Sequence, residues 1–163
     1  MPGKVFSVTH RIFFNETNAM GGVVYFSNFV KWQGMVREAF LTQAVPEWPL
    51  LIEEARQGNV NMITVEEHST FIDHVYFGDV IQINIQASDL RRMSFRINFE
   101  MTKNSLDRVI YRGWQKLAFQ DKKGNLMTVP SALFDAVLEH SPVSEVNEYK
   151  EKYLNNDNHL LNQ

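Results

Sequence analysis

Residues 15–41 read NETNAMGGVVYFSNFVKWQGMVREAFL, and this stretch decides the fold. It begins as the end of a strand, turns at Gly21 and Gly22, and continues from Val23 to about Ala44 with the periodicity of a helix. The main apolar stripe of this helix consists of Tyr25, Phe29, Trp32, Val36 and Phe40. Because only a narrow polar arc remains, we expect the helix to be wrapped by a curved sheet and a second subunit.

One β-patterned run precedes the helix and several follow it. Val5–Phe14 alternates with a period of two, and we interpret His10 on its apolar face as structural because nothing nearby orients it. After a polar linker at Glu53–Asn59, further runs cover Asn61–Phe71, Val80–Ala87, Ser94–Lys103 and Val109–Asp121. Leu126–Val129 then precedes a short helix at Ser131–Glu139. This order favours an α+β hotdog fold, a curved antiparallel sheet wrapped round a long central helix.

The composition describes a globular protein without thiol chemistry. Hydrophobic residues form 44% of the 163 residues, enough for one domain, which we expect over 1–140. The absence of cysteine excludes disulfides, thiolate zinc sites and a cysteine nucleophile. A net charge of -3 gives no basic field for nucleic acid, and no segment resembles a signal peptide or membrane span, so a cytoplasmic protein is expected. The polar residues 141–163 predict an extension that is partly helical and then mobile.

The segment Glu16–Leu41 resembles the strand-to-helix segment of hotdog thioesterases of the 4-hydroxybenzoyl-CoA type. Its ETN turn and the pattern WQG…RE.FL in its helix are most similar to thioesterases of enediyne polyketide pathways. The likeness covers Val5 to about Leu138 and includes the FGD turn at Phe77–Asp79. It implies a thioesterase that needs no cofactor and no metal, and a homo-dimer or homo-tetramer with sites shared between subunits.

Asn18 lies where the 4-hydroxybenzoyl-CoA type carries a catalytic aspartate. Since an amide is no base near neutral pH, the resemblance implies that Asn18 holds a water or donates to an oxyanion. A plain turn residue is the alternative, because asparagine readily closes such turns. Glu16 is the one carboxylate near the turn that remains as a candidate base, and it can share a face with Asn18.

The glycine turn is the second part of the predicted site. Gly21 and Gly22, with the following amides including that of Val24, lie where the helix is expected to begin. Unpaired N–H groups there would receive the oxygen of a thioester carbonyl. In the resembling family, the amide at the position of Tyr25 polarises this carbonyl. The alternative is a glycine turn that simply starts a helix.

Arg37 is the most informative charged residue in the helix. On the helical wheel it lies between Gln33 and Leu41, on the side of Phe26 and Val30, so its head is partly buried. The residues alone leave a structural ion pair and a functional group equally open. The resemblance implies that Arg37 stabilises the oxyanion.

The remaining candidates would contact the substrate. Apolar side chains near the turn, Phe29 and Trp32 with Tyr25, would line a pocket for a long or conjugated acyl chain. The resemblance places the pantetheine arm and phosphates of CoA near Arg91, Arg92 and Ser94, although two arginines also form common solvated turns. His68, Asp73 and His74 are interpreted as surface strand residues, because no histidine lies at metal-ligand spacing.

The sequence therefore predicts an acyl-thioester hydrolase acting on a polyketide or fatty acyl chain carried by an acyl carrier protein or CoA. Two alternatives remain. A non-catalytic acyl-binding protein would explain the missing carboxylate at Asn18. A hotdog dehydratase is disfavoured, because it needs a catalytic histidine and residues 23–44 contain none.

Overall fold

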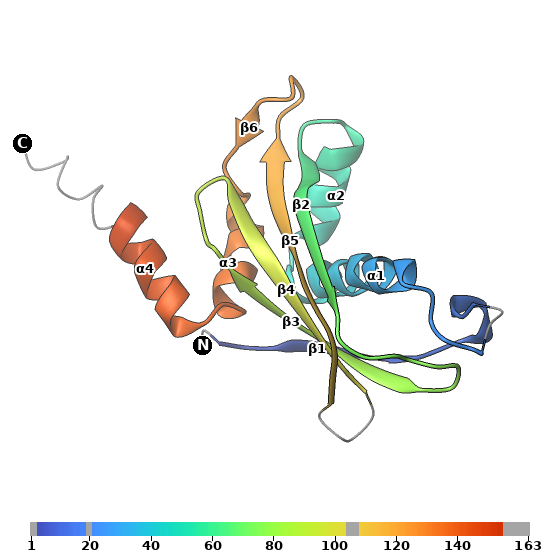
Figure 1. The fold of residues 1–163 in the computed structure, drawn as a ribbon. Helices are drawn as coiled ribbons and strands as arrows, with labels where there is room; N and C mark the ends of the chain where they lie inside the picture. Colours follow the sequence, from blue (N-terminus) through green and yellow to red (C-terminus); the bar gives the residue numbers. More distant parts are fainter. Residues whose placement is uncertain (1–2, 19–20, 104–107, 155–163) are drawn as a thin grey trace, which may run out of the picture.

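The computed structural model describes residues 3–18, 21–103 and 108–154, and a curved antiparallel sheet is its largest element (Figure 1). The strands follow the spatial order β1-β3-β4-β5-β2, and a short β6 pairs with β5. β1 and β2 therefore form the two edges of the sheet. The strands are β1 (Phe6–Arg11), β2 (Asn61–Phe71), β3 (Val80–Ser88), β4 (Ser94–Lys103), β5 (Arg108–Gln120) and β6 (Leu126–Met127).

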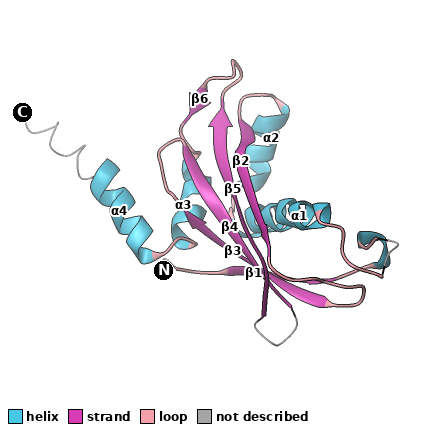
Figure 2. Ribbon diagram, in the orientation of Figure 1, coloured by secondary structure: helices cyan, strands magenta, loops and turns pink. Residues whose placement is uncertain are grey.

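The long helix α1 (Ser27–Ala44) lies against one face of this sheet, as Figure 2 shows. Along β3, β4 and β5 every second residue is buried, which gives the sheet an apolar inner face toward the helix. Ile81, Ile83 and Ile85 of β3 are fully buried. The helix buries Phe29, Trp32, Gln33, Val36, Phe40 and Leu41. The structure confirms the predicted α+β hotdog fold.

Two local predictions about helices were wrong. The long helix begins at Ser27 rather than at Val23, because Val23 and Val24 are extended and form isolated bridges with Tyr76 and Thr17. A second helix, α2 (Trp48–Arg56), covers the first four residues of Glu53–Asn59, which was expected to be a polar linker. Pro49 lies in the first turn of α2, where a proline loses no hydrogen bond.

The C-terminal part of the chain forms two further helices. α3 spans Ser131–Glu139, as predicted, and buries Leu133, Ala136 and Val137. α4 spans Val143–Tyr153 and stands at the side of the sheet near the N-terminus (Figure 1). The predicted mobile tail lies outside the described residues. Among the described helices, none is both long and apolar enough to cross a membrane.

One end of α1 is not covered by its own chain. Tyr25 is 51% exposed, Phe26 58% and Val30 37%, and Phe71 of the neighbouring edge strand is 49% exposed. The rings of Phe26 and Phe71 meet edge to face, with centroids 6.2 Å apart. We refer to these four residues as the open face. Such a continuous apolar surface beside a free strand edge is typical of an interaction site.

Candidate active site

The segment around Asn18 forms a narrow hairpin-like turn in front of α1. Its base is a bridge between Thr17 and Val24, and the Asn18 N–H donates to the carbonyl oxygen of Val23 at 2.8 Å. Gly21 and Gly22 have φ angles of +84° and +71°, a conformation that favours glycine strongly. The two glycines therefore serve the turn itself, and Asn18 is exposed beside it.

Glu16 anchors this turn to the rest of the molecule. Its Oε1 accepts hydrogen bonds from the Trp32 indole at 2.7 Å and from His10 Nε2 at 3.0 Å. Its Oε2 accepts from the Phe13 N–H at 2.8 Å and also lies 3.0 Å from His10 Nε2. The Glu16 backbone oxygen accepts from the Asn28 side chain. One carboxylate thus joins β1, the 3-10 helix η1 (Phe14–Glu16) and α1.

These contacts bear on two interpretations of the sequence. Burial raises the pKa of the Glu16 carboxyl, but the hydrogen bonds from Phe13, Trp32 and His10 outweigh it, and the net pKa is lowered from its ordinary value. With both oxygens occupied and the residue 7% exposed, the geometry argues against a general-base role for Glu16. The expectation that nothing nearby orients the His10 ring was wrong, because Glu16 forms hydrogen bonds with it.

The amide donors at the start of α1 differ from those expected. The Val24 N–H donates to Val75 O at 2.8 Å, and the Tyr25 N–H donates to Glu16 O at 3.1 Å, so both are already satisfied. Because the helix starts four residues later than predicted, its free end lies at Phe26 and Ser27. Among the described residues, no backbone acceptor receives these two N–H groups. The backbone N–H groups without a backbone acceptor thus lie one to two residues beyond the predicted ones.

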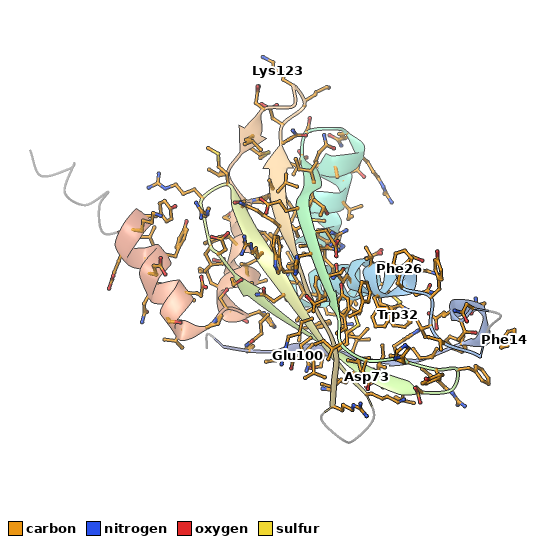
Figure 3. The ribbon with its side chains drawn as sticks, in the orientation of Figure 1. Phe14, Phe26, Trp32, Asp73, Glu100 and Lys123 are labelled. Atoms are coloured by element: carbon orange, nitrogen blue, oxygen red, sulfur yellow. The ribbon has the colours of Figure 1, made fainter. Side chains whose placement is uncertain are left out.

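An apolar cavity of about 240 Å³ opens beside this helix end. Val24 and Phe29, both predicted to contact substrate, line it together with Phe26, Phe71 and the segment Ile72–Val75. Trp32 is not among the lining residues, since its indole is buried against Glu16. In Figure 3, Phe26 and Trp32 mark this end of α1, and Phe14 marks the far end of the turn segment.

A larger cavity, of about 480 Å³, lies on the other face of the sheet. Amide and charged side chains such as Asn84, Asn98 and Glu100 line it, and these alternate with the buried residues of β3 and β4. It therefore faces away from α1 and from every group of the turn. Its size alone does not make it the site.

Arg37 lies on the side of α1 that faces β2 and β5. Its Nη1 donates to Gln115 Oε1 at 2.6 Å and to Thr64 Oγ1 at 3.0 Å. Burial lowers the pKa of the guanidinium, and the neighbouring Glu38 charge opposes this. Within the part of the chain that the structure describes, no acceptor bonds Nε or Nη2, and no carboxylate forms an ion pair with Arg37. Half of the guanidinium is thus fixed and the other half remains available.

A single chain does not bring Asn18 and Arg37 together. Arg37 is ten residues into α1, which is about 15 Å from the helix start at 1.5 Å per residue. Phe29 near that start contacts Phe71 at the end of β2, with ring centroids 5.4 Å apart, whereas Arg37 contacts Thr64 near the beginning of β2. α1 and β2 therefore run in opposite directions, with Asn18 and Arg37 toward opposite ends of the pair.

The residues predicted to meet the CoA nucleotide lie at the far end of β3. That strand begins next to the glycine turn, where Phe77 N–H donates to Gly22 O, and it runs nine residues, about 30 Å, to Ser88. Arg91 pairs with Asp89 at 3.0 Å, and Arg92 donates to the Tyr153 carbonyl of α4 at 3.0 Å. Ser94 is buried at the start of β4. None of the three approaches the Asn18 turn of its own chain.

Sequence reasoning missed a group of buried polar side chains behind Arg37. Gln33 is completely buried, Gln115 is 5% exposed, and Tyr111 is completely buried. Gln115 Nε2 donates to Gln33 Oε1 at 2.7 Å, and Gln33 Nε2 donates to the Tyr111 hydroxyl. One available signal was Gly113, a glycine inside a long strand pattern, which often marks a close approach of other atoms.

The fold and the turn together define the class of protein: an α+β hotdog protein with an asparagine-containing turn before the start of its long helix. Residues 13–140 match the sequence model of the Thioesterase-like superfamily, so the chain belongs to that family. A search of curated protein sequences finds no significant match.

Solved structures with the same fold include several thioesterases. The 1,4-dihydroxy-2-naphthoyl-CoA thioesterase from Synechocystis superposes with a TM-score of 0.75 at 16% identity, covering 82% of this chain and 96% of that one. The dynemicin thioesterase, described in connection with polyene binding, has a TM-score of 0.74 at 23% identity, covering 86% and 99%. An aspartate-to-asparagine variant of 4-hydroxybenzoyl-CoA thioesterase, complexed with 4-hydroxybenzoyl-CoA, has a TM-score of 0.70 at 18% identity, covering 82% and 98%.

Proposed function

We propose that this protein hydrolyses acyl thioesters, and that each active site combines the Asn18 turn of one copy with Arg37 of the partner subunit. The observation that carries the proposal is the guanidinium of Arg37. It is half-buried, bonded through Nη1 alone, and in no ion pair with a carboxylate among the described residues, which suits a donor to a developing oxyanion. Membership of the Thioesterase-like superfamily supports the choice of reaction.

The direction of α1 relative to β2 supports the shared site. β2 is an edge strand of eleven residues, and two such edges can pair antiparallel across a twofold axis. In that arrangement the Thr64 end of one β2 meets the Phe71 end of the other. Arg37 of the partner subunit then approaches the helix start, the apolar cavity and Asn18 of the first copy. The open face would be buried in the same step.

The proposed reaction needs no carboxylate base. The thioester carbonyl oxygen lies near the free N–H groups of Phe26 and Ser27 and near Arg37 of the partner subunit, which together stabilise the negative charge that develops on it. A water held by the Asn18 amide attacks the carbonyl carbon and loses a proton to solvent. The bond between carbon and sulfur then breaks, and the thiolate, a good leaving group, departs and is protonated. The products are a carboxylic acid and a free thiol.

The cavity beside the helix start supports an apolar acyl group. Its aromatic lining, Phe26, Phe29 and Phe71, fits a long or conjugated chain of the polyketide or fatty acyl type. The dynemicin thioesterase has the same fold, and its structure was described in connection with polyene binding, which supports the choice of a conjugated chain. The carrier is CoA or an acyl carrier protein, both of which present the thioester on the same pantetheine arm.

A thiol-release assay tests the proposal. The purified protein is incubated with straight-chain and polyunsaturated acyl-CoAs and with the same acyl groups on an acyl carrier protein, and free thiol is measured. We expect turnover that rises with acyl chain length. Short-chain acyl-CoAs serve as the control, because they cannot fill the apolar cavity.

A non-catalytic acyl-binding protein is the second candidate, and one observation favours it. Among the described residues around the turn, the nearest carboxylate, Glu16, is fully occupied by donors. The same assay separates the two functions when it is paired with a binding measurement. Micromolar binding of long acyl-CoAs without release of thiol would replace hydrolysis by binding as the function.

A further inference from the structure

We infer that Gln115 and Gln33 are positioning residues for Arg37, at the head of a directed series of hydrogen bonds that crosses the core. This inference rests on the proposed function of Arg37. The series joins six side chains in the order Arg37, Gln115, Gln33, Tyr111, Ser69 and Glu67. It runs from α1 to β5, back to α1, and then through β5 to β2.

Every hydrogen bond in this series has its donor on the Arg37 side. Arg37 Nη1 donates to Gln115 Oε1, and Gln115 Nε2 donates to Gln33 Oε1. Tyr111 accepts from Gln33 Nε2, so its own proton is left for Ser69, 2.6 Å away. Ser69 in turn donates to the carboxylate of Glu67. The series therefore begins at a cation and ends at an anion, and each hydrogen bond polarises the next in the same direction.

This direction determines that Gln115 presents its side-chain oxygen, and not its NH₂ group, to Arg37. If the Gln115 amide turned over, its NH₂ group would face the guanidinium and its oxygen would face the oxygen of Gln33. Both amides are buried, so each lost hydrogen bond would leave an unsatisfied polar atom. The core thus holds an acceptor 2.6 Å from Nη1 and keeps the guanidinium in one orientation.

A glycine in β5 makes room for the series. A Cβ atom at Gly113 would lie 2.6 Å from Gln33 Nε2, from the Tyr111 hydroxyl and from the backbone oxygen of His68. Glycine weakens a strand interior, yet it occupies the middle of a 13-residue strand at this point. The absence of a side chain at Gly113 therefore leaves the space that Gln33 and Tyr111 need for their hydrogen bond.

Next to Arg37 the edge strand is adapted as well. The register of β2 against β5 shifts between Thr64 and Glu66, which marks a β-bulge. Thr64 supplies the second acceptor of Arg37 Nη1. Bulges re-aim side chains beside functional sites. The bulge thus lies next to an acceptor of Arg37, and Gly113 leaves room for the hydrogen bonds behind Gln115.

The experiment compares two substitutions of Gln115. Gln115→Met keeps the volume and removes the acceptor, whereas Gln115→Glu keeps an oxygen for Nη1, loses the donor to Gln33 and adds a negative charge. We expect Gln115→Met to lower kcat roughly tenfold with KM changed less than about twofold. Gln115→Glu keeps the guanidinium fixed but pairs it with a carboxylate, so we expect it to lower kcat less than Gln115→Met does. Gln82→Met, the same change on the exposed outer face of β3, is the control and should leave kcat unchanged.

A double-mutant cycle with Arg37→Lys shows whether the effect passes through Arg37. In the Arg37→Lys background, Gln115→Met should change kcat no further, because the group that it positions is gone. Parental kcat in Gln115→Met, or an equal loss of kcat with and without Arg37, would overturn the inference. A purely structural glutamine would show the reverse order, with buried charge making Gln115→Glu the more damaged protein in a thermal melt.

A measurement without substrate keeps this inference separate from the proposed function. Arginine ¹⁵N spectra report rotation of the guanidinium, and we expect slow rotation of the Arg37 amino groups in the parent and in Gln115→Glu. Fast averaging should appear in Gln115→Met. If the parent releases no thiol but shows this pattern, the proposed function fails and the positioning holds. An Arg37 signal that is the same in Gln115→Met and in the parent rejects the positioning whatever the activity.

Discussion

At the scale of single residues, Glu16 and Arg37 have different roles in the proposed site. Glu16 has both carboxylate oxygens filled by donors from β1, from Phe13 and from α1, so the geometry favours a role in holding the turn. Arg37 has one amino group fixed and the other available. The sequence singled out both residues but could assign neither role, because the partners of Arg37 lie 27 and 78 residues away.

The Glu16 network should appear in the pH dependence of stability. The folded-state pKa of Glu16 lies below its ordinary value of 4.5, so its carboxylate stabilises the fold fully above that value and loses this contribution as pH falls through the folded pKa. Glu16→Gln should lose about 1–3 kcal/mol at pH 7, since buried donors then face an NH₂ group. Thermal melts from pH 7 to pH 3 should show the gap between parent and variant closing below pH 4.5. A constant gap would mean that this carboxylate does not titrate with folding.

Arg37→Lys tests the oxyanion role directly. Lysine keeps the charge but loses the planar fork, so turnover should fall by roughly 10²–10³, or about 2.7–4 kcal/mol. Substrate binding should change less, because the interaction strengthens as charge develops on the oxygen. Single-turnover rates and thermal melts are measured together, with Arg11→Lys, an exposed arginine of β1, as the control. Parental rates in a less stable protein would leave Arg37 with a structural role only.

At the scale of elements, periodicity predicted β-strands and the long helix but not how they meet. β2 to β5 and α3 were found where they were expected, since alternation and turn residues are local signals. The first strand was expected to reach Phe14, but it ends at Arg11 and a 3-10 helix covers Phe14–Glu16. α2 was missed because its polar residues from Glu53 onward were interpreted as a linker, and the start of α1 was misplaced because Val23 and Val24 form isolated bridges with Tyr76 and Thr17. The polar series behind Arg37 depends on strand register, which a single sequence does not reveal.

Gly113→Ala tests whether β5 is built around that series. The added Cβ would collide with three polar atoms at 2.6 Å, and we expect a loss of about 1–3 kcal/mol in the free energy of unfolding. Gly34→Ala in α1 is the matched control, because its Cβ would meet nothing within 4 Å and alanine favours a helix by about 0.5–1 kcal/mol. Chemical denaturation of both variants gives the comparison. Equal stability of Gly113→Ala and the parent would show that the close approach is easily relieved.

At the scale of the whole molecule, the open face and the free edge of β2 predict a homo-oligomer. Tyr25, Phe26, Val30 and Phe71 expose apolar surface beside that edge, and a second copy would cover it. Analytical ultracentrifugation at micromolar concentration should give a stable dimer or tetramer. A monomer under these conditions would remove the shared site together with the second copy that it requires.

The most direct measurement is complementation between two damaged copies. Asn18→Ala and Arg37→Lys are co-expressed with different affinity tags, and the mixed oligomer is assayed for thiol release. If each site takes Asn18 from one copy and Arg37 from the other, half of the sites in a mixed dimer are intact. The mixed dimer purified through both tags should then reach about half of the parental rate, although each variant alone is nearly inactive. A mixture no faster than the mean of the two separate variants would contradict a site shared in this way.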